Sequence, residues 1–158
     1  MTARKNKLEK DWYIWLLFLI IAAFLCSRFF FQMALIQGNS MEPNYHHLQL
    51  VLINKCDDHY SAGDVIIFRK NCVGVVIKRI VAVPGDSVQI SNGVLCVNGK
   101  DKTGKYEHIN HCGRADVELV MEDGKYFVLG DNVNGSIDSR FEEIGDVDAR
   151  EILGKVVF

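Results

Sequence analysis

The stretch VGVVIKRIVAVPGD, residues 73–86, indicates the fold of the region around it. Its β-branched residues predict a strand, and the PGD triplet predicts the turn that ends it. Lys78 interrupts the apolar run and Arg79 follows directly. The pattern alone favours an exposed edge for both. Because successive strand residues point to opposite faces, the alternative is that one of the two is directed inward.

Similar short runs recur on both sides of this stretch. They are rich in β-branched residues and separated by turn formers such as SAGD, and the NG at 92–93 is a hairpin signal. The predicted strands cover residues 48–55, 64–70, 73–83, 87–91, 94–99, 125–130 and 152–158. No convincing helical period follows residue 36, and the polar segment 100–116 is expected as an edge loop. The sequence predicts a mostly β, antiparallel, barrel-like domain.

The N-terminal part differs in character. WYIWLLFLIIAAFLCS, residues 12–27, contains no formal charge, and the apolar run resumes after Arg28 as far as residue 36. A cleaved signal peptide would have a shorter apolar region and an A-x-A site, while a buried core helix would have a polar face. We therefore predict a transmembrane signal anchor over residues 11–36 that is not cleaved.

Charge predicts the orientation of this anchor. Residues 1–10, MTARKNKLEK, hold four basic residues and one acidic residue. Basic flanks stay on the cytoplasmic side of a membrane. The expected organisation is a cytoplasmic N-terminus over 1–10, a single transmembrane segment over 11–36, and an extracytoplasmic β domain over 37–158.

Composition argues against several classes of binding site. The formal net charge is −2 and no basic run is present, so nucleic acid is not an expected partner. The five cysteines include no CxxC pair, which argues against a zinc site and against a complete disulfide framework. Cys96 and Cys112 could pair in an extracellular domain, although two reduced thiols are favoured. We expect no metal.

The candidate nucleophile is Ser40, within GNSMEP at residues 38–43. A serine needs a base to take its proton. The five histidines all lie in polar stretches typical of exposed loops. Lys78 is the alternative, because apolar burial can lower the pKa of a lysine by several units and make the neutral amine available. Serine–lysine pairs are a known variant of the nucleophile–base arrangement.

A third motif, GDNVNGSIDSR at residues 130–140, follows a predicted strand. With S-M-x-P at residues 40–43 and K-R-I-V-A-V-P-G-D at 78–86, in this order behind a membrane anchor, it resembles the bacterial type I signal peptidases. These leader peptidases are serine proteases with a Ser–Lys dyad. All three motifs are complete, and the resemblance covers essentially the whole chain.

The resemblance implies specific roles. Ser40 would be the acylating nucleophile, Lys78 the general base, and Ser136 a hydroxyl that hydrogen-bonds and orients the lysine amine. No cofactor would be needed. The backbone N–H of Ser40 would contribute to the oxyanion hole. Some relatives add a serine hydroxyl two residues earlier, where this chain has Gly38.

Other residues would have supporting roles. Asp138 and Arg140 would form a structural ion pair near the site, and Met41 would pack beside the serine as part of a substrate subsite. The family fold is a mostly antiparallel β domain with a smaller β insertion. In this chain the insertion would be short and would fall at about residues 92–120.

The implied activity is a membrane-anchored endopeptidase that removes signal peptides from secreted precursors, with small residues at the −1 and −3 positions. Its partners would be those precursors and membrane lipid, close to the secretion translocon, at the cell membrane. Two alternatives belong to other classes. One is a noncatalytic relative that acts as an assembly factor, for instance in pilus biogenesis. The other is a self-cleaving repressor, which would carry a DNA-binding domain where this chain has an anchor.

Overall fold

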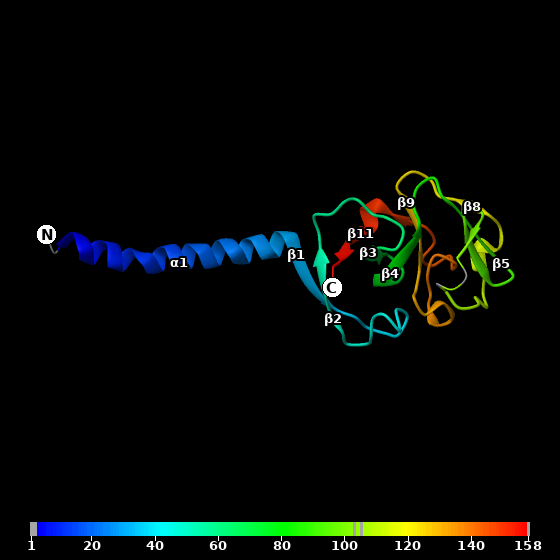
Figure 1. Ribbon diagram of the computed structural model, residues 1–158, viewed down its shortest axis with the longest axis horizontal. Coiled ribbons are helices and arrows are strands. Elements are labelled where there is room, and N and C mark those ends of the chain that lie inside the picture. The colour runs from blue at the N-terminus through cyan, green and yellow to red at the C-terminus, as the bar shows by residue number, and fades with distance from the viewer. Residues whose placement is uncertain (1–2, 103, 105, 158) are drawn as a thin grey trace.

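A computed structural model describes residues 3–102, 104 and 106–157, and a long helix at its N-terminal end projects away from the β domain (Figure 1). This helix, α1, spans Ala3–Phe30. Its stretch Trp12–Phe30 is 19 residues long with a mean hydropathy of 2.1, and none of the side chains described in it is buried. At about 1.5 Å per residue it covers about 28 Å, close to the hydrocarbon thickness of a bilayer. The helix is therefore a candidate membrane anchor by length and composition.

The helix ends at Phe30, six residues before the end that the sequence predicted for the anchor. The next residues form a strand, β1 (Phe31–Leu35), which pairs antiparallel with β2 (Leu50–Asn54). The amide of Lys55 also donates to the carbonyl of Phe30 at 3.0 Å, a typical length for such a bond. Hydropathy alone could not locate this change, because an apolar run suits either a helix or a strand.

The domain that comes after α1 is built from antiparallel strands. Its larger sheet has seven strands in the order β1-β2-β11-β3-β4-β9-β10. The members not yet bounded are β3 (Val65–Lys70), β4 (Gly74–Ala82), β9 (Lys125–Leu129), β10 (Val147–Asp148) and β11 (Ile152–Val156). The position of β4 between β3 and β9 makes it an interior strand of this sheet.

A second, four-stranded sheet has the order β7-β6-β5-β8. These strands are β5 (Ser87–Ser91), β6 (Val94–Val97), β7 (Lys100–Asp101) and β8 (Leu119–Val120). These strands lie between residues 87 and 120, so the sheet begins before the insertion expected at about 92–120, which stays a prediction. Segment 100–116 is more than the predicted edge loop, since it contains β7 and a 3₁₀ turn at Gly113–Asp116 and buries Ile109 and Ala115.

A core joins the two sheets. Ala82 of β4 and Phe127 of β9 are fully buried in the same cluster as Val88 and Ile90 of β5. Burial of apolar surface stabilises a fold by about 25 cal/mol per Å². The side chains of this cluster therefore stabilise the packing of the small sheet against β4 and β9. The ends of these two strands carry the second and third sequence motifs.

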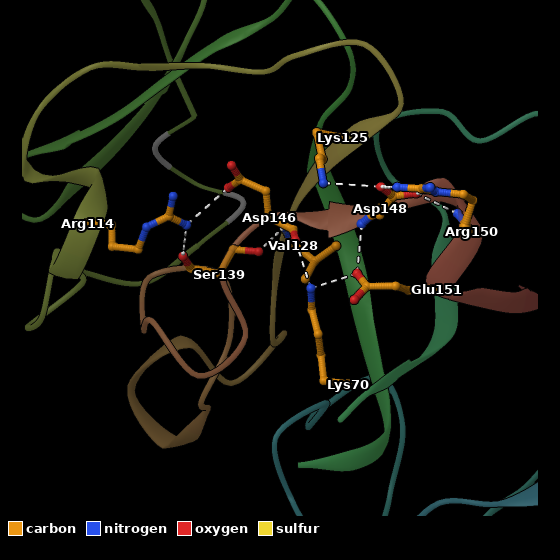
Figure 2. A network of polar contacts seen from close by, with 9 residues as sticks. All are labelled: Lys70, Arg114, Lys125, Val128, Ser139, Asp146, Asp148, Arg150 and Glu151. Atoms are coloured by element: carbon orange, nitrogen blue, oxygen red, sulfur yellow. Dashed lines mark hydrogen bonds and ion pairs between the residues drawn. The ribbon is translucent and has the colours of Figure 1, made fainter. Parts of the chain in front are cut away.

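Ion pairs hold the C-terminal segment against the larger sheet (Figure 2). Lys70, at the end of β3, donates to Glu151 Oε2 at 2.6 Å and to the carbonyl of Asp146 at 2.9 Å. Lys125 of β9 lies 3.1 Å from Asp148 Oδ2. The acceptors in these contacts lie just before β11 in the chain, and β11 itself lies between β2 and β3 in the sheet.

The predicted fold class is confirmed as a mostly β, antiparallel architecture with one N-terminal apolar helix. The barrel-like closure stays a prediction. Of the cysteines whose side chains are described, Cys96 and Cys112 are free thiols, as are Cys56 and Cys72. The segment between β1 and β2, the strand β4, and the loop after β9 converge on the candidate site.

Candidate active site

The loop between β1 and β2 positions Ser40. The amide of Asn132, in the loop after β9, donates to the Ser40 carbonyl at 3.1 Å. Gly130 makes this approach possible, because a Cβ at that position would lie 2.5 Å from the Ser40 carbonyl oxygen and 2.3 Å from Ser136 Oγ. Any larger residue would push the first and third motifs apart.

Lys78 reaches Ser40 from β4. Its Nζ lies 2.7 Å from Ser40 Oγ, a hydrogen-bonding distance. The lysine is only 3 % exposed. The pattern-based expectation of an exposed edge is therefore wrong for Lys78, because the loop that carries Ser40 packs against this part of β4. Burial lowers the pKa of Lys78 from 10.5 to about 8, while the carboxylates of Asp138 and Asp131 act in the opposite direction.

The carboxylate of Asp138 is already engaged by Arg140. Arg140 Nε lies 2.7 Å from Asp138 Oδ1, and Gly130 N donates to Asp138 Oδ2 at 3.1 Å. Both side chains are buried. The pair ties the two ends of the 130–140 loop together, and Asp138 is not left as a free counter-ion for the lysine.

Ser136 lies beside this pair in a buried position. Among the described residues its Oγ has no hydrogen-bond partner. The hydrogen bond to Lys78 that the resemblance implies is therefore not formed in this structure. A buried hydroxyl without a partner is costly and uncommon, and such a group is often found where function requires it.

A second ion pair near the site was not among the predicted site residues. Arg79 Nε and one terminal nitrogen lie 2.7 and 2.6 Å from the two oxygens of Asp131, and Asn44 Nδ2 donates to the same carboxylate at 2.8 Å. This contact joins the second and third motifs to the loop that carries the first. The signal was present in the sequence, since Arg79 follows the lysine and Asp131 stands second in the GDN triplet.

Ser40 and Lys78 line an apolar cavity of about 510 Å³. Its lining comes from residues 34–37 and from residues 73 and 75–78, together with Ile67 and Ile137. Ile137 was also missed from sequence, although it stands directly after Ser136. Met41 is fully buried in the core cluster that contains Ile36, and so lies behind the cavity wall.

The loop between β1 and β2, residues 36–49, carries Ser40 and is called the serine loop. A second cavity, of about 750 Å³, lies on the Arg79 side of this loop. Its lining includes Glu42, Arg79, Tyr106 and Asp131, but neither Ser40 nor Lys78. Of these two cavities, the smaller, apolar one is therefore the one onto which the nucleophile and the base open.

The five histidines, His46, His47, His59, His108 and His111, are all exposed, as their polar surroundings predicted. None of them donates to or accepts from Ser40 or Lys78 in the hydrogen bonds found among the described residues. Lys78 is the basic group that the fold brings to the serine.

Comparison with known proteins agrees with this geometry. The family model described as signal peptidase, peptidase S26, matches residues 9–158. The chain is 30 % identical to a signal peptidase I of Bacillus licheniformis, over 99 % of this chain and 90 % of that protein. It is 32 % identical to signal peptidase IB of Staphylococcus aureus strain Mu50, over 94 % and 87 % respectively. With all three motifs assembled around Ser40 and Lys78, the chain belongs to the signal peptidase family, peptidase S26.

Proposed function

We propose that this chain is a membrane-anchored serine endopeptidase that removes N-terminal signal peptides from secretory precursor proteins. The observation that carries the proposal is the 2.7 Å contact between Lys78 Nζ and Ser40 Oγ at an apolar cavity. Signal peptidase I, the name of its relatives, supports the same substrate class. No observation favours the noncatalytic assembly factor.

The first half of the reaction is acyl transfer to Ser40. The neutral amine of Lys78 takes the hydroxyl proton as Ser40 Oγ attacks the carbonyl carbon of the scissile peptide. The tetrahedral intermediate then expels the amine of the mature protein, which receives the proton from the Lys78 ammonium. The signal peptide remains joined to Ser40 as an ester, and the mature protein leaves with a new N-terminus.

The second half is hydrolysis of that ester. Lys78 is neutral again after the first half and takes a proton from a water molecule, which attacks the ester carbonyl. Collapse of the second tetrahedral intermediate returns the proton to Ser40 and releases the signal peptide with a free carboxylate. Lowering the pKa of Lys78 to about 8 serves both halves, because each begins with the neutral amine.

The shape of the cavity supports an extended substrate. Residues 34 and 35 of β1 and residues 75–78 of β4 both line it, and a peptide strand bound there could pair with the backbone of either strand. Main-chain hydrogen bonds would then supply affinity, while the apolar walls select small residues at the −1 and −3 positions. Met41 would support the wall from behind, next to Ile36.

Ser136 would orient the Lys78 amine once substrate has bound, and Asp138 with Arg140 would hold the loop that carries it. Because its hydroxyl has no partner among the described residues, Ser136→Ala should reduce kcat by about 100-fold without lowering Tm. Ser139→Ala is the matched control. Its Oγ accepts from the Val128 amide at 2.9 Å, so its loss should cost about 1–2 kcal/mol of stability. Equal kcat losses in both variants would argue against an orienting role.

The anchor would insert with residues 1–10 in the cytoplasm and the β domain outside. Because α1 leads directly into β1, the exposed side chains of Phe31, Met33 and Leu35 would begin at the lipid surface, close to the cavity. Protease added to right-side-out vesicles should cut within residues 100–116. Protection of that segment, with digestion of the N-terminus instead, would overturn this topology.

A direct assay tests the activity. Detergent-solubilised full-length protein, incubated with a secretory precursor that ends its signal peptide in A-x-A, should release the mature protein with a single new N-terminus. Ser40→Ala should abolish the release. A wild-type protein that binds the precursor without cutting it would instead favour the noncatalytic class.

A further inference from the structure

The serine loop leaves the larger sheet through a narrow neck. The amide of Ile36 donates to the Gln49 carbonyl at 2.9 Å, and the amide of Leu48 donates to the Ile36 carbonyl at 2.8 Å. Among the described residues, the backbone ladder between the two sides of this loop ends with these two bonds. The residues that lead to Ser40 therefore need other partners to be fixed in place.

On its far side the loop is held by Asn132. Its amide donates to the Ser40 carbonyl at 3.1 Å, and its side-chain Nδ2 donates to the Asn39 carbonyl at 3.3 Å. Both contacts act on carbonyl groups. They leave the amide of Gly38, two residues before the nucleophile, to be held from the near side.

That near-side contact comes from a histidine. The amide of Gly38 donates to His47 Nδ1 at 3.0 Å. This bond follows the two backbone bonds across the loop, but its acceptor is a side chain and not a backbone carbonyl. Gly38 has a φ of +94°, in a region that glycine enters freely. Without a partner for its amide, a glycine in this position has many accessible conformations, and the direction of the chain into Ser40 would vary with them.

We infer that His47 is a positioning residue for the nucleophile, acting through Gly38. The inference rests on the proposed function, because its consequence for activity requires that Ser40 attacks a substrate. His47 accepts the bond at Nδ1, so the proton of the neutral imidazole lies on Nε2. The part it plays is that of a hydrogen-bond acceptor, and it makes no hydrogen bond to Ser40 or Lys78 among the described residues.

The chain offers matched variants for a test. Asparagine places its side-chain oxygen at the same distance along the side chain as Nδ1, so His47→Asn keeps an acceptor for Gly38. His47→Leu keeps bulk and loses the acceptor. His46→Leu is the control, because the neighbouring His46 is also exposed but makes no side-chain hydrogen bond among those found in the described part of the chain.

The experiment uses the full chain in detergent with an A-x-A precursor, and measures kcat and KM together with amide hydrogen exchange in peptides that contain Gly38. His47→Leu should lower kcat by about 3- to 10-fold, with KM and Tm unchanged, and should accelerate exchange at Gly38. His47→Asn and His46→Leu should resemble the wild type in both measurements.

Two outcomes would overturn the inference. The first is a His47→Leu protein with wild-type kcat and wild-type exchange at Gly38. The second is a His47→Asn protein as impaired as His47→Leu, which would assign the effect to the imidazole ring and not to the acceptor. If the wild type cleaves no precursor, the proposed function fails, and the exchange rates still decide whether His47 holds Gly38.

Discussion

Lys78 and Arg79 are neighbours on β4, yet the fold gives the two side chains different partners and opposite shifts in pKa. Lys78 is buried, and its hydrogen bond goes to the neutral hydroxyl of Ser40. Arg79 is bound through two nitrogens to the carboxylate of Asp131. Burial lowers the pKa of Lys78 to about 8, whereas the hydrogen-bonded carboxylate of Asp131 raises the pKa of Arg79 further above its ordinary value.

The difference arises from the chemistry of each side chain. A guanidinium stays protonated under all ordinary conditions, so a partly buried arginine needs a carboxylate partner. An ammonium can lose its proton, so a buried lysine without a carboxylate partner becomes a base that works near neutral pH. The carboxylates that could have stabilised a charged Lys78 are instead bound by Arg79 and Arg140.

The largest effect is expected when the lysine is made to resemble its neighbour. Lys78→Arg should reduce kcat/KM for precursor cleavage by at least about 1,000-fold, because arginine cannot accept the proton of Ser40. Lys78→Ala should be equally inactive. Cleavage assays on purified variants with one precursor measure both.

Lys100→Arg, in the exposed strand β7, is the control for this substitution and should leave activity unchanged. Substantial cleavage by Lys78→Arg would mean that another group takes the proton of Ser40. The difference between Lys78 and Arg79 would then not explain the activity.

The next effect concerns stability and pH. Below pH 8 both folded and unfolded chains carry a charged Lys78, and the folded state bears the full cost of burying it. Between pH 8 and 10.5 only the unfolded chain binds the proton, so the stability of the folded state rises with pH. The total gain should be about 3 kcal/mol, at about 1.4 kcal/mol per pKa unit.

Denaturant unfolding of the wild type and of Lys78→Met measures this gain. The methionine variant should be the more stable of the two at pH 7, and its advantage should shrink as pH rises from about 8 to 10.5. A difference that does not change with pH over this interval would show that Lys78 keeps an ordinary pKa in the folded protein.

The smallest effect is expected on the Arg79 side. Asp131→Asn should lower the free energy of unfolding by about 2 kcal/mol, because Arg79 loses a charged partner and an NH₂ group replaces one of the two oxygens that accept from Arg79 and Asn44. Arg150→Ala is the comparison, since Arg150 is 89 % exposed and its pair with Asp148, screened by solvent, should contribute much less than the Arg79 pair. Chemical denaturation at pH 7 separates the two. Equal losses in the free energy of unfolding would mean that the Arg79–Asp131 pair, although partly buried, stabilises the fold no more than an exposed pair does.

Sequence reasoning reached Ser40, Lys78 and the 130–140 loop because each lies in a short motif with its own residue pattern. It did not reach the Arg79–Asp131 contact, which joins residues 52 positions apart on separate elements. It also did not locate the change from helix to strand at Phe30, six residues before the predicted end of the anchor. The strand partner of residues 31–35 is β2, and an apolar run does not reveal what it will pair with.

Local sequence was enough to establish the apolar N-terminal span, the antiparallel β character of the domain after it, and the order of the three motifs. These depend on composition and periodicity, which are readable one segment at a time. The three-dimensional fold was needed to establish that Lys78 is buried and that its neighbouring carboxylates are bound by arginines. Burial and pairing depend on which strands flank β4 and on which loop packs against it, and such long-range contacts have no signature in any single stretch of residues.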